Sequence, residues 1–352
     1  MQSNSSTITT CQSRDYTQNS DEIIHVVLSV YDPSGTYSQH AGVVMTSIFE
    51  NTKSKVTVHI LHDDTLTEEN RQRFIRTAEK YSQSVQLISI EHQKRAIVQK
   101  IPEAAQRITP GALYRLLAYE VIDVRKLIYL DCDIIVNLDI AELWGVDLNG
   151  KTLAAVKDPA SSIGKFSARG LMMKLAGCNI HEYFNAGVLV MDLDRIRSRK
   201  DFTMEAISWL FYKGDLAPSV DQDALNSIFR GDVKFIAGKF NNYKIYDDVS
   251  DSIIHFWASK PWSDMQGLET DRLYWKMFLR SAWGENLTPE EVADVMNDMA
   301  YKTTHSAGSK YHRSGKDCIR RLVRSVQRRI APHVGIAKYF LTRIRLCFRR
   351  KP

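Results

Sequence analysis

The sequence predicts an α/β protein built on a mostly parallel, helix-covered sheet. Apolar segments of strand length alternate with segments of helical periodicity from residue 23 to residue 257, a pattern typical of parallel strands joined by helices. A second observation points the same way. Asp131 and Asp133 directly follow a strongly apolar segment, and open α/β sheets bind their ligands at the carboxyl ends of strands.

The expected strands share an apolar composition and cover residues 23–31, 56–62, 85–90, 126–136, 152–157, 184–192, 233–237 and 252–257. The expected helices cover residues 43–50, 68–81, 110–122 and 203–213, and one more helix opens at Asp221. Thr67 is suited to cap the helix over 68–81, because its hydroxyl can accept a hydrogen bond from a first-turn amide. The helix dipole favours an acid such as Glu68 in this first turn. The sequence contains no internal repeat.

Composition bounds the domain organisation. With 352 residues, 44% of them hydrophobic, the chain can bury a substantial core, and no apolar run approaches the ~18 residues of a membrane span. We expect a disordered segment over 1–20, which lacks the apolar region of a secretory signal, one α/β domain over 21–285, and a helical basic region over 286–352. Five scattered cysteines indicate free thiols in a reducing cytosol.

The net charge of +6 is unevenly distributed along the chain. Residues 301–352 contain 15 Lys or Arg and one acid, Asp317, so they carry +14, whereas the other 300 residues carry −8. A basic tail on an acidic body indicates an anionic partner, either lipid headgroups or nucleic acid.

The triplet Asp131-Cys132-Asp133 predicts a metal site that binds phosphates. In a strand, residues i and i+2 point to the same face, so both carboxylates can reach one cation, and Mg²⁺ and Mn²⁺ prefer such oxygen ligands. Spacing alone is weak support, because Asp192 and Asp194 repeat it and such triplets are common in solvated turns. Cys132 is expected to point into the core as a small buried residue.

Six phrases, in this order over roughly 240 residues, resemble those of the retaining glycosyltransferases of family 8, which include bacterial lipopolysaccharide galactosyl- and glucosyltransferases and glycogenin. They are Ser47-Ile-Phe-Glu-Asn-Thr52, Tyr114-Arg-Leu116, Tyr129-Leu-Asp-Cys-Asp133, Phe184-Asn-Ala-Gly187, Asp221-Gln-Asp-Ala-Leu-Asn226 and His255-Phe-Trp-Ala-Ser-Lys-Pro-Trp262. The resemblance implies a GT-A nucleotide-sugar-binding fold, transfer of galactose or glucose from a UDP-hexose, and Mn²⁺ as the cofactor, with Mg²⁺ as the alternative.

The resemblance assigns the metal and the diphosphate to named residues. Asp131, Asp133 and His255 are the expected metal ligands, and an imidazole ligand favours Mn²⁺ over the harder Mg²⁺. Lys260 is expected to contact the diphosphate, and Arg115 to reach the donor. From the sequence pattern alone, without this resemblance, we would expect His255 to be a core histidine, Lys260 a solvated loop lysine and Arg115 a helix-surface arginine.

Four further residues are expected to face the donor sugar: Asp158, Asn185, Asp221 and Gln222. Asp158 follows a strand, and Asn185 precedes two small residues that leave room for a ligand. Asp221 fits a helix N-cap equally well. Gln222 corresponds to the residue that faces the anomeric carbon, and because an amide is a poor nucleophile, we expect front-side displacement with retention.

Base recognition departs from the family pattern. After the first strand the chain reads Tyr31-Asp-Pro33, where many members have two acids and an Asn. Asp32 is expected to contact uracil or ribose, and Tyr31 to stack on the base. Pro33 replaces a side chain able to form hydrogen bonds.

Two other classes compete with this interpretation. A haloacid-dehalogenase-type phosphohydrolase also places Asp-x-Asp after an apolar strand, although usually near the N-terminus and with Thr or Val where this chain has Ile135. A nucleic-acid-binding protein would explain only the basic tail, so no nucleic acid is expected as a partner.

The tail over 310–352 has two amphipathic patterns. Ile319, Leu322, Val323, Val326 and Ile330 recur at helical spacing with arginines on other faces, and Ile336, Phe340, Ile344 and Phe348 begin a second stripe. Apolar residues opposite basic clusters are typical of helices that lie in a lipid interface. We therefore expect a cytoplasmic enzyme, peripheral on the inner face of the plasma membrane, acting on a glycan or glycolipid acceptor. A helix packed on the body is the alternative.

Overall fold

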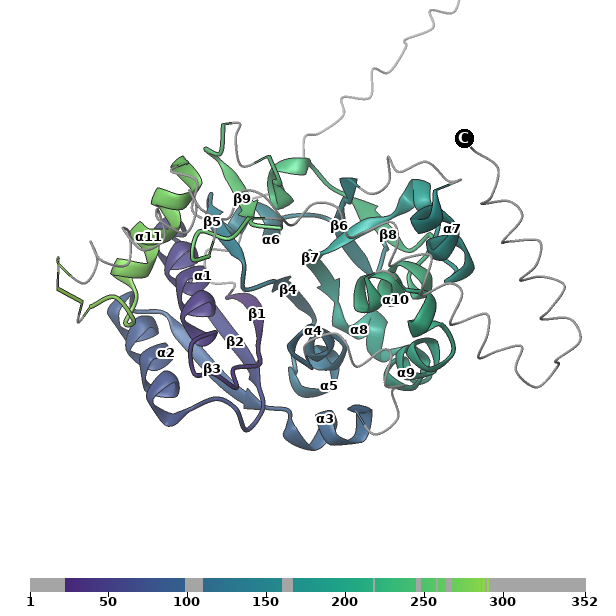
Figure 1. Ribbon diagram of the computed structural model, residues 1–352, viewed down its shortest axis with the longest axis horizontal. Coiled ribbons are helices and arrows are strands. Elements are labelled where there is room, and N and C mark those ends of the chain that lie inside the picture. The colour runs from purple at the N-terminus through teal and green to yellow at the C-terminus, as the bar shows by residue number, and fades with distance from the viewer. Residues whose placement is uncertain are drawn as a thin grey trace, which may run out of the picture.

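A seven-stranded sheet in the order β3-β2-β1-β4-β7-β6-β8 forms the centre of the molecule (Figure 1). The computed structural model describes residues 23–98, 110–159, 167–217, 219–244, 248–257, 259–263, 268–285, 287–288 and 290. The expected segments 1–20 and 310–352 therefore lie outside the described residues, as does nearly all of 286–352.

The strands are β1 (Ile24–Val30), β2 (Val56–His62), β3 (Ser84–Ser89), β4 (Lys126–Leu130), β5 (Ile134–Asn137), β6 (Leu153–Lys157), β7 (Phe184–Asp192), β8 (Val233–Phe235) and β9 (Ser252–His255). Within the seven-stranded sheet, β7 pairs antiparallel with both β4 and β6, and the other pairs are parallel. The predicted mostly parallel α/β sheet is confirmed. Strands β5 and β9 pair separately as a small antiparallel sheet.

The described helices are α1 (Ser38–Asn51), α2 (Glu68–Lys80), α3 (Glu91–Val98), α4 (Pro110–Tyr114), α5 (Ala118–Val121), α6 (Ala141–Trp144), α7 (Ala168–Leu175), α8 (Leu193–Arg197), α9 (Phe202–Lys213), α10 (Val220–Ile228) and α11 (Glu269–Arg280). In Figure 1, α1, α2 and α11 lie beside the β1–β3 half of the molecule, and α7, α9 and α10 lie beside the other half. The predicted helix over 110–122 is interrupted by a 3₁₀ turn at Arg115–Leu117.

The central strands are buried on both faces, which explains their nearly continuous apolar runs. On β1, Val26 and Leu28 pack into the core formed with α1 and α2, and Val27 packs into the core on the other face. Full burial of such an aliphatic side chain contributes about 1.5–3 kcal/mol.

Helix α1 begins at Ser38, five residues before its predicted start, because Asp32 binds its first turn. The Asp32 carboxylate accepts hydrogen bonds from the amides of Tyr37 and Ser38 at 2.7 and 2.9 Å, and from the Asn70 side chain at 3.2 Å. An acid that satisfies free amides at a helix start stabilises the helix. Thr67 caps α2 as predicted, with Oγ1 accepting from the Asn70 amide.

The predicted single strand over 126–136 is wrong. The chain leaves the large sheet after Leu130 and enters the small sheet at Ile134, so Asp131, Cys132 and Asp133 form the link between β4 and β5. The Asp131 amide still donates to the Gly187 carbonyl of β7 (2.8 Å), and the Asp133 carbonyl accepts from the Phe256 amide after β9 (2.9 Å). The two acids are therefore fixed by different sheets.

A third core, which the sequence did not predict because α11 was missed, joins the small sheet to α1. Phe256, Tyr274 and Trp275 pack there with Ile135, and Tyr274 OH lies 2.7 Å from His40 Nδ1. Trp283, after α11, packs on Gly42 of α1 and donates to Asn70 Oδ1 at 3.1 Å.

Two properties of the described residues bear on cellular context. Cys132 and Cys178 are free and buried. Among the described helices, none combines the length and the apolarity needed to cross a bilayer.

The contact between Gly42 and Trp283 yields a stability prediction. A Cβ at position 42 would lie 2.3 Å from Cζ3 of Trp283, so Gly42→Ala must displace the indole. We expect a loss of about 1–2 kcal/mol of unfolding free energy, since overpacking outweighs the gain in helix propensity, measured by urea unfolding. Gly238→Ala is the matched control, because no atom lies within 4 Å of its added Cβ. Equal midpoints for the two variants would contradict the packing argument.

Candidate active site

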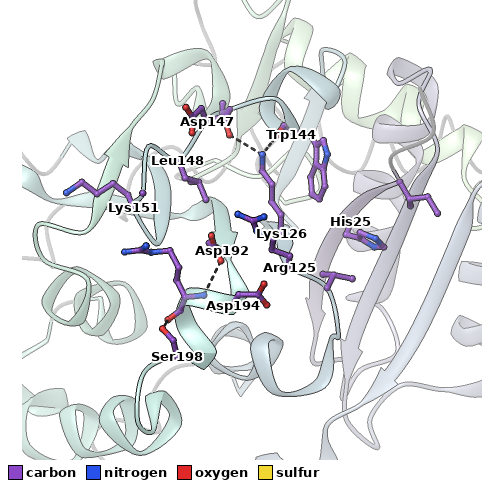
Figure 2. A pocket seen from close by; sticks show the side chains of 15 residues that line it. His25, Arg125, Lys126, Trp144, Asp147, Leu148, Lys151, Asp192, Asp194 and Ser198 are labelled. Carbon is purple, nitrogen blue, oxygen red and sulfur yellow. Dashed lines mark hydrogen bonds between the residues drawn. The ribbon is translucent and has the colours of Figure 1, made fainter. Parts of the chain in front are cut away.

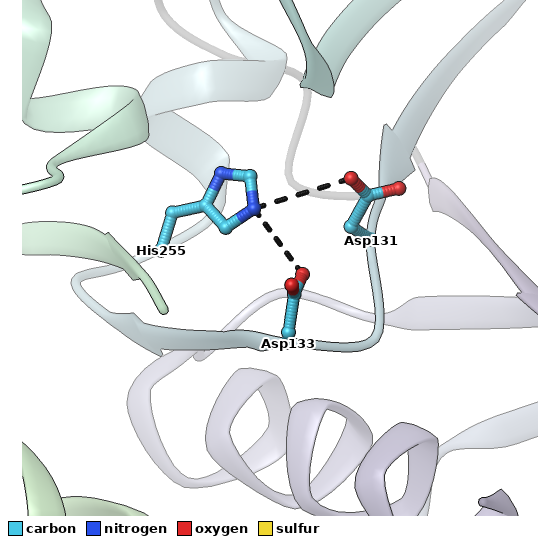
Figure 3. A group of neighbouring side chains, drawn as sticks. All are labelled: Asp131, Asp133 and His255. Atoms are coloured by element: carbon cyan, nitrogen blue, oxygen red, sulfur yellow. Dashed lines mark ion pairs between the residues drawn. The ribbon is translucent and has the colours of Figure 1, made fainter. Parts of the chain in front are cut away.

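Three predicted metal ligands meet where β4 and β9 end and β7 begins. Asp131 and Asp133 come from the β4–β5 link and His255 is the last residue of β9 (Figure 3). His255 Nε2 lies 3.2 Å from Asp133 Oδ1 and 4.0 Å from Asp131 Oδ2, and one ligand atom of each residue falls within 4.8 Å of the others. Residues more than 120 positions apart are thus brought to one point.

The hydrogen bonds of His255 suit a metal ligand. Its Nδ1 lies 2.8 Å from Asn241 Oδ1, and Asn241 Nδ2 donates to Asn185 Oδ1 at 2.9 Å, so Asn241 Oδ1 must accept and Nδ1 carries the proton. His255 Nε2 then faces the two carboxylates, and a divalent cation between them would stabilise this arrangement. Asp133 Oδ1 is buried and accepts no hydrogen bond from the described residues. The donor set therefore fits a divalent metal.

Gly187 keeps the space beside these ligands open. A Cβ at this position would lie 2.4 Å from His255 Cε1 and 2.8 Å from Asp131 Oδ2. Any other residue at 187 would therefore intrude on the ligand atoms. Gly187 belongs to a phrase that the sequence analysis singled out, whereas Asn241, which orients His255, was missed because no local pattern marks it.

Charge balance keeps Asp133 ionised. Its carboxylate forms an ion pair with Lys260 through Oδ2. Burial by itself raises the pKa of the Asp133 carboxyl, but His255 and Lys260 outweigh burial and hold that pKa below its ordinary value. Lys260 therefore lies beside the three candidate metal ligands. Its expected contact with a diphosphate stays a prediction.

Arg115 is a buried residue rather than the exposed one that helical periodicity alone would suggest. Its side chain is 6% exposed and donates to Asp131 Oδ1 at 2.8 Å, while Nε lies 3.1 Å from Asp221 Oδ2. Burial opposes the charge, yet Asp131, Tyr129 and Asp221 raise the pKa of Arg115 well above its usual value. The guanidinium therefore connects Asp131, one of the candidate metal ligands, to Asp221 of α10. Because α10 begins at Val220, Asp221 is not its N-cap.

Three of the four residues predicted to face the sugar, Asp158, Asn185 and Gln222, form one hydrogen-bonded group, whereas Asp221 pairs with Arg115. Asn185 Nδ2 and Gln222 Nε2 both donate to Asp158 Oδ2, at 3.2 and 3.1 Å. Gln222 Oε1 accepts from the Ala186 amide at 3.0 Å. Asn185 also accepts a hydrogen bond from Asn241, which in turn bonds His255. This polar group is therefore continuous with the three candidate metal ligands.

Residues 15–266 match the family model described as glycosyl transferase family 8. The chain belongs to this family. It is a glycosyltransferase with the GT-A fold, so the phosphohydrolase and non-enzyme interpretations are superseded.

Similar proteins agree with the family assignment. The chain is 29% identical over 213 residues to a putative glycosyltransferase of Haemophilus influenzae, covering 60% of this chain and 62% of that protein. It is 26% identical over 296 residues to the lipopolysaccharide 1,2-glucosyltransferase of Escherichia coli, covering 79% and 84%. The crystal structure of the galactosyltransferase LgtC with donor and acceptor sugar analogs superposes with a TM-score of 0.63 at 22% identity, covering 77% of this chain and 100% of that one.

The Asp32 carboxylate of this family 8 enzyme already forms hydrogen bonds within the protein. Asp32 is 1% exposed, and its oxygens are already used by the first turn of α1 and by Asn70. Tyr31 is half-buried, with its Cβ close to Gly111 and Lys94 Nζ 5.8 Å from its ring centre. Contacts of Tyr31 and Asp32 with a base stay predictions.

A separate cavity of about 960 Å³ in this glycosyltransferase lies at the amino ends of β1 and β4 and contains none of the predicted site residues (Figure 2). Its charged groups serve the local fold. Lys126 Nζ donates to the Val146 carbonyl at 3.0 Å, and Asp192 caps α8 by accepting from the Arg195 amide at 3.0 Å.

The open space at Gly187 predicts a metal-binding defect. Gly187→Ala should weaken Mn²⁺ binding at least about tenfold, because the methyl group displaces His255 or Asp131 from the ligand position. Calorimetry or electron paramagnetic resonance with Mn²⁺ measures this effect, and circular dichroism checks the fold.

Cys132→Ala provides the control for Gly187→Ala. The Cys132 thiol lies between the two acids in sequence but donates to the Ser29 carbonyl at 3.3 Å, away from the ligands. This variant should bind Mn²⁺ like the wild type. Unchanged Mn²⁺ binding in Gly187→Ala would contradict the assigned metal position.

Proposed function

We propose that this enzyme transfers a hexose, galactose or glucose, from a UDP-sugar to a hydroxyl of a cell-surface glycan or glycolipid, with retention of the anomeric configuration. The observation that carries the proposal is the continuity of the Asp131–Asp133–His255 cluster with the polar group of Asp158, Asn185 and Gln222. One group suits a metal-bound diphosphate and the other the hydroxyls of a sugar. The lipopolysaccharide glucosyltransferase and the galactosyltransferase among the similar proteins support this substrate class.

Asp131, Asp133 and His255 would hold Mn²⁺, with Mg²⁺ as the alternative. A bound divalent cation supplies a Lewis acid that neutralises charge growing on the departing diphosphate. The chain adds charge of its own, since Lys260 at Asp133 can contact the same phosphates. These interactions lower the barrier because they strengthen as the sugar–phosphate bond breaks.

The acceptor oxygen is proposed to attack from the face that the diphosphate leaves. The bond from the anomeric carbon to the phosphate oxygen breaks, a bond to the acceptor oxygen forms, and the acceptor proton passes to the departing phosphate. Gln222 is the proposed neighbour of the anomeric carbon. As an amide it is a weak nucleophile, so its carbonyl oxygen would stabilise positive charge on the sugar rather than form a covalent bond. Asp158, Asn185 and Asp221 would hold the sugar hydroxyls.

Hydrolysis of a panel of UDP-sugars in the presence of Mn²⁺ tests this function without knowledge of the acceptor. We expect slow hydrolysis of one UDP-hexose, loss of activity with EDTA, and better recovery with Mn²⁺ than with Ca²⁺. Asp133→Ala should abolish turnover, because the lost metal removes several kcal/mol of transition-state stabilisation. A β-configured sugar product from an α-linked donor, seen by NMR, would contradict retention, and wild-type rates in Asp133→Ala would contradict the metal site.

We further propose that residues 310–352 hold the enzyme at the inner face of the plasma membrane, where a lipid-linked acceptor would be met. Support comes from the net charge of +14 over 301–352, since each basic residue near an anionic leaflet contributes about 1 kcal/mol. Deleting 310–352 should release the enzyme from anionic liposomes and preserve Mn²⁺-dependent donor hydrolysis. Neutral liposomes are the control. Sedimentation of the truncated enzyme with anionic liposomes would contradict this role.

A further inference from the structure

We propose that Tyr183 and Asp223 form a buried clamp that fixes the side-chain amide of Gln222, making both of them positioning residues for sugar transfer. The inference rests on the proposed function of Gln222. It adds two residues that do not face the substrate to those that set the geometry of the reaction.

The amide of Gln222 is held at three points. Its Oε1 accepts from the Ala186 amide at 3.0 Å, which identifies the other terminal atom as the nitrogen. The two hydrogens of Nε2 point to Asp158 Oδ2 and to the Tyr183 hydroxyl, both at 3.1 Å. In a flipped amide, the NH₂ group of Gln222 would face the N–H of Ala186, and its oxygen would face the Asp158 carboxylate. Neither pair can form a hydrogen bond, so the contacts select a single orientation.

Asp223 determines the direction of the Tyr183 hydroxyl. The hydroxyl lies 2.6 Å from Asp223 Oδ1. Above pH 7 the Asp223 carboxylate is ionised and can only accept, so the tyrosine proton points toward Asp223. A lone pair of the hydroxyl oxygen is then available to the Gln222 amide. Without Asp223, the hydroxyl proton of Tyr183 could turn toward Gln222 Nε2 and oppose the hydrogen bond that Nε2 donates.

Both clamp residues are shielded from any substrate. Tyr183 and Asp223 are each 0% exposed, and Asp223 Oδ2 already accepts from the Ser219 amide at 2.7 Å. Burial raises the pKa of Asp223 to about 7, and no Lys or Arg forms an ion pair with it among the described residues. Hydrogen bonds from Tyr183 and the Ser219 amide and the charge of Arg169 act in the opposite direction and stabilise the Asp223 carboxylate.

A double-mutant cycle in donor hydrolysis tests the clamp. Tyr183→Phe keeps the ring and removes the hydroxyl, so we expect kcat to fall about tenfold or more while KM for the UDP-sugar stays within about twofold. In a Gln222→Ala background, the same substitution should change kcat by less than about twofold, because the clamped amide is gone. Tyr119→Phe, which removes a hydroxyl bonded to Thr203, is the matched control and should leave kcat unchanged.

The outcomes separate the clamp from the proposed function. If Gln222→Ala lowers kcat but Tyr183→Phe lowers it by the same factor in both backgrounds, Tyr183 acts only through packing and the clamp is wrong. If Gln222→Ala keeps the wild-type kcat, the proposed role of Gln222 fails and the clamp fails with it. Asp223→Asn, run through the same cycle, supplies the answer if Tyr183→Phe does not fold, and should likewise lose its effect without Gln222.

Discussion

The buried guanidinium of Arg115 is the interaction on which the geometry of the site depends. It contacts the carboxylates of Asp131 and Asp221 and donates to the carbonyls of Ala112 and Ala186. These partners belong to the β4–β5 link, α10, α4 and β7, so one side chain connects four elements. Loss of one member of a buried ion pair costs about 3–5 kcal/mol, because it leaves its partner charged and unpaired. The candidate metal ligand Asp131 and helix α10, which carries Gln222, are therefore positioned by the same group.

A continuous chain of hydrogen bonds also runs through the site, starting from His255. Successive hydrogen bonds join seven side chains, in the order His255, Asn241, Asn185, Asp158, Gln222, Tyr183 and Asp223. In a low-dielectric interior such bonds polarise one another, so a change in charge at the metal end alters the strength of bonds at the sugar end. The catalytic groups then act as one connected unit.

The sequence predicted most strands closely, because fully buried strands leave continuous apolar runs such as Val56–His62 and Phe184–Asp192. It placed Asp131 and Asp133 correctly at the end of β4 but assumed an unbroken strand, since an apolar run does not reveal that the chain changes sheets. Asp32 was predicted as a base contact because an acid after β1 fits either role, and only the fold shows it at the start of α1.

Other features left no local signal. Asn241, Tyr183 and Asp223 gain their positions from partners distant in sequence, and no spacing rule marks such pairs. Helix α11 was missed although its apolar face packs on α1 and the small sheet. Burial of Arg115 was equally hidden, because its two carboxylate partners lie 16 and 106 residues away along the chain.

The reversed direction of β7 has an evolutionary consequence. Because it runs opposite to its neighbours β4 and β6, its amino end, not its carboxyl end, lies at the edge of the sheet where Asp131 is found. Residues 184–187 therefore enter the site directly from the preceding connection between β6 and β7. Such connections accept insertions and substitutions more readily than the strands they join. Changes in the exposed part of this connection can thus alter what lies beside the site, while Asp158, Tyr183 and the strand that follows keep its hydrogen bonds.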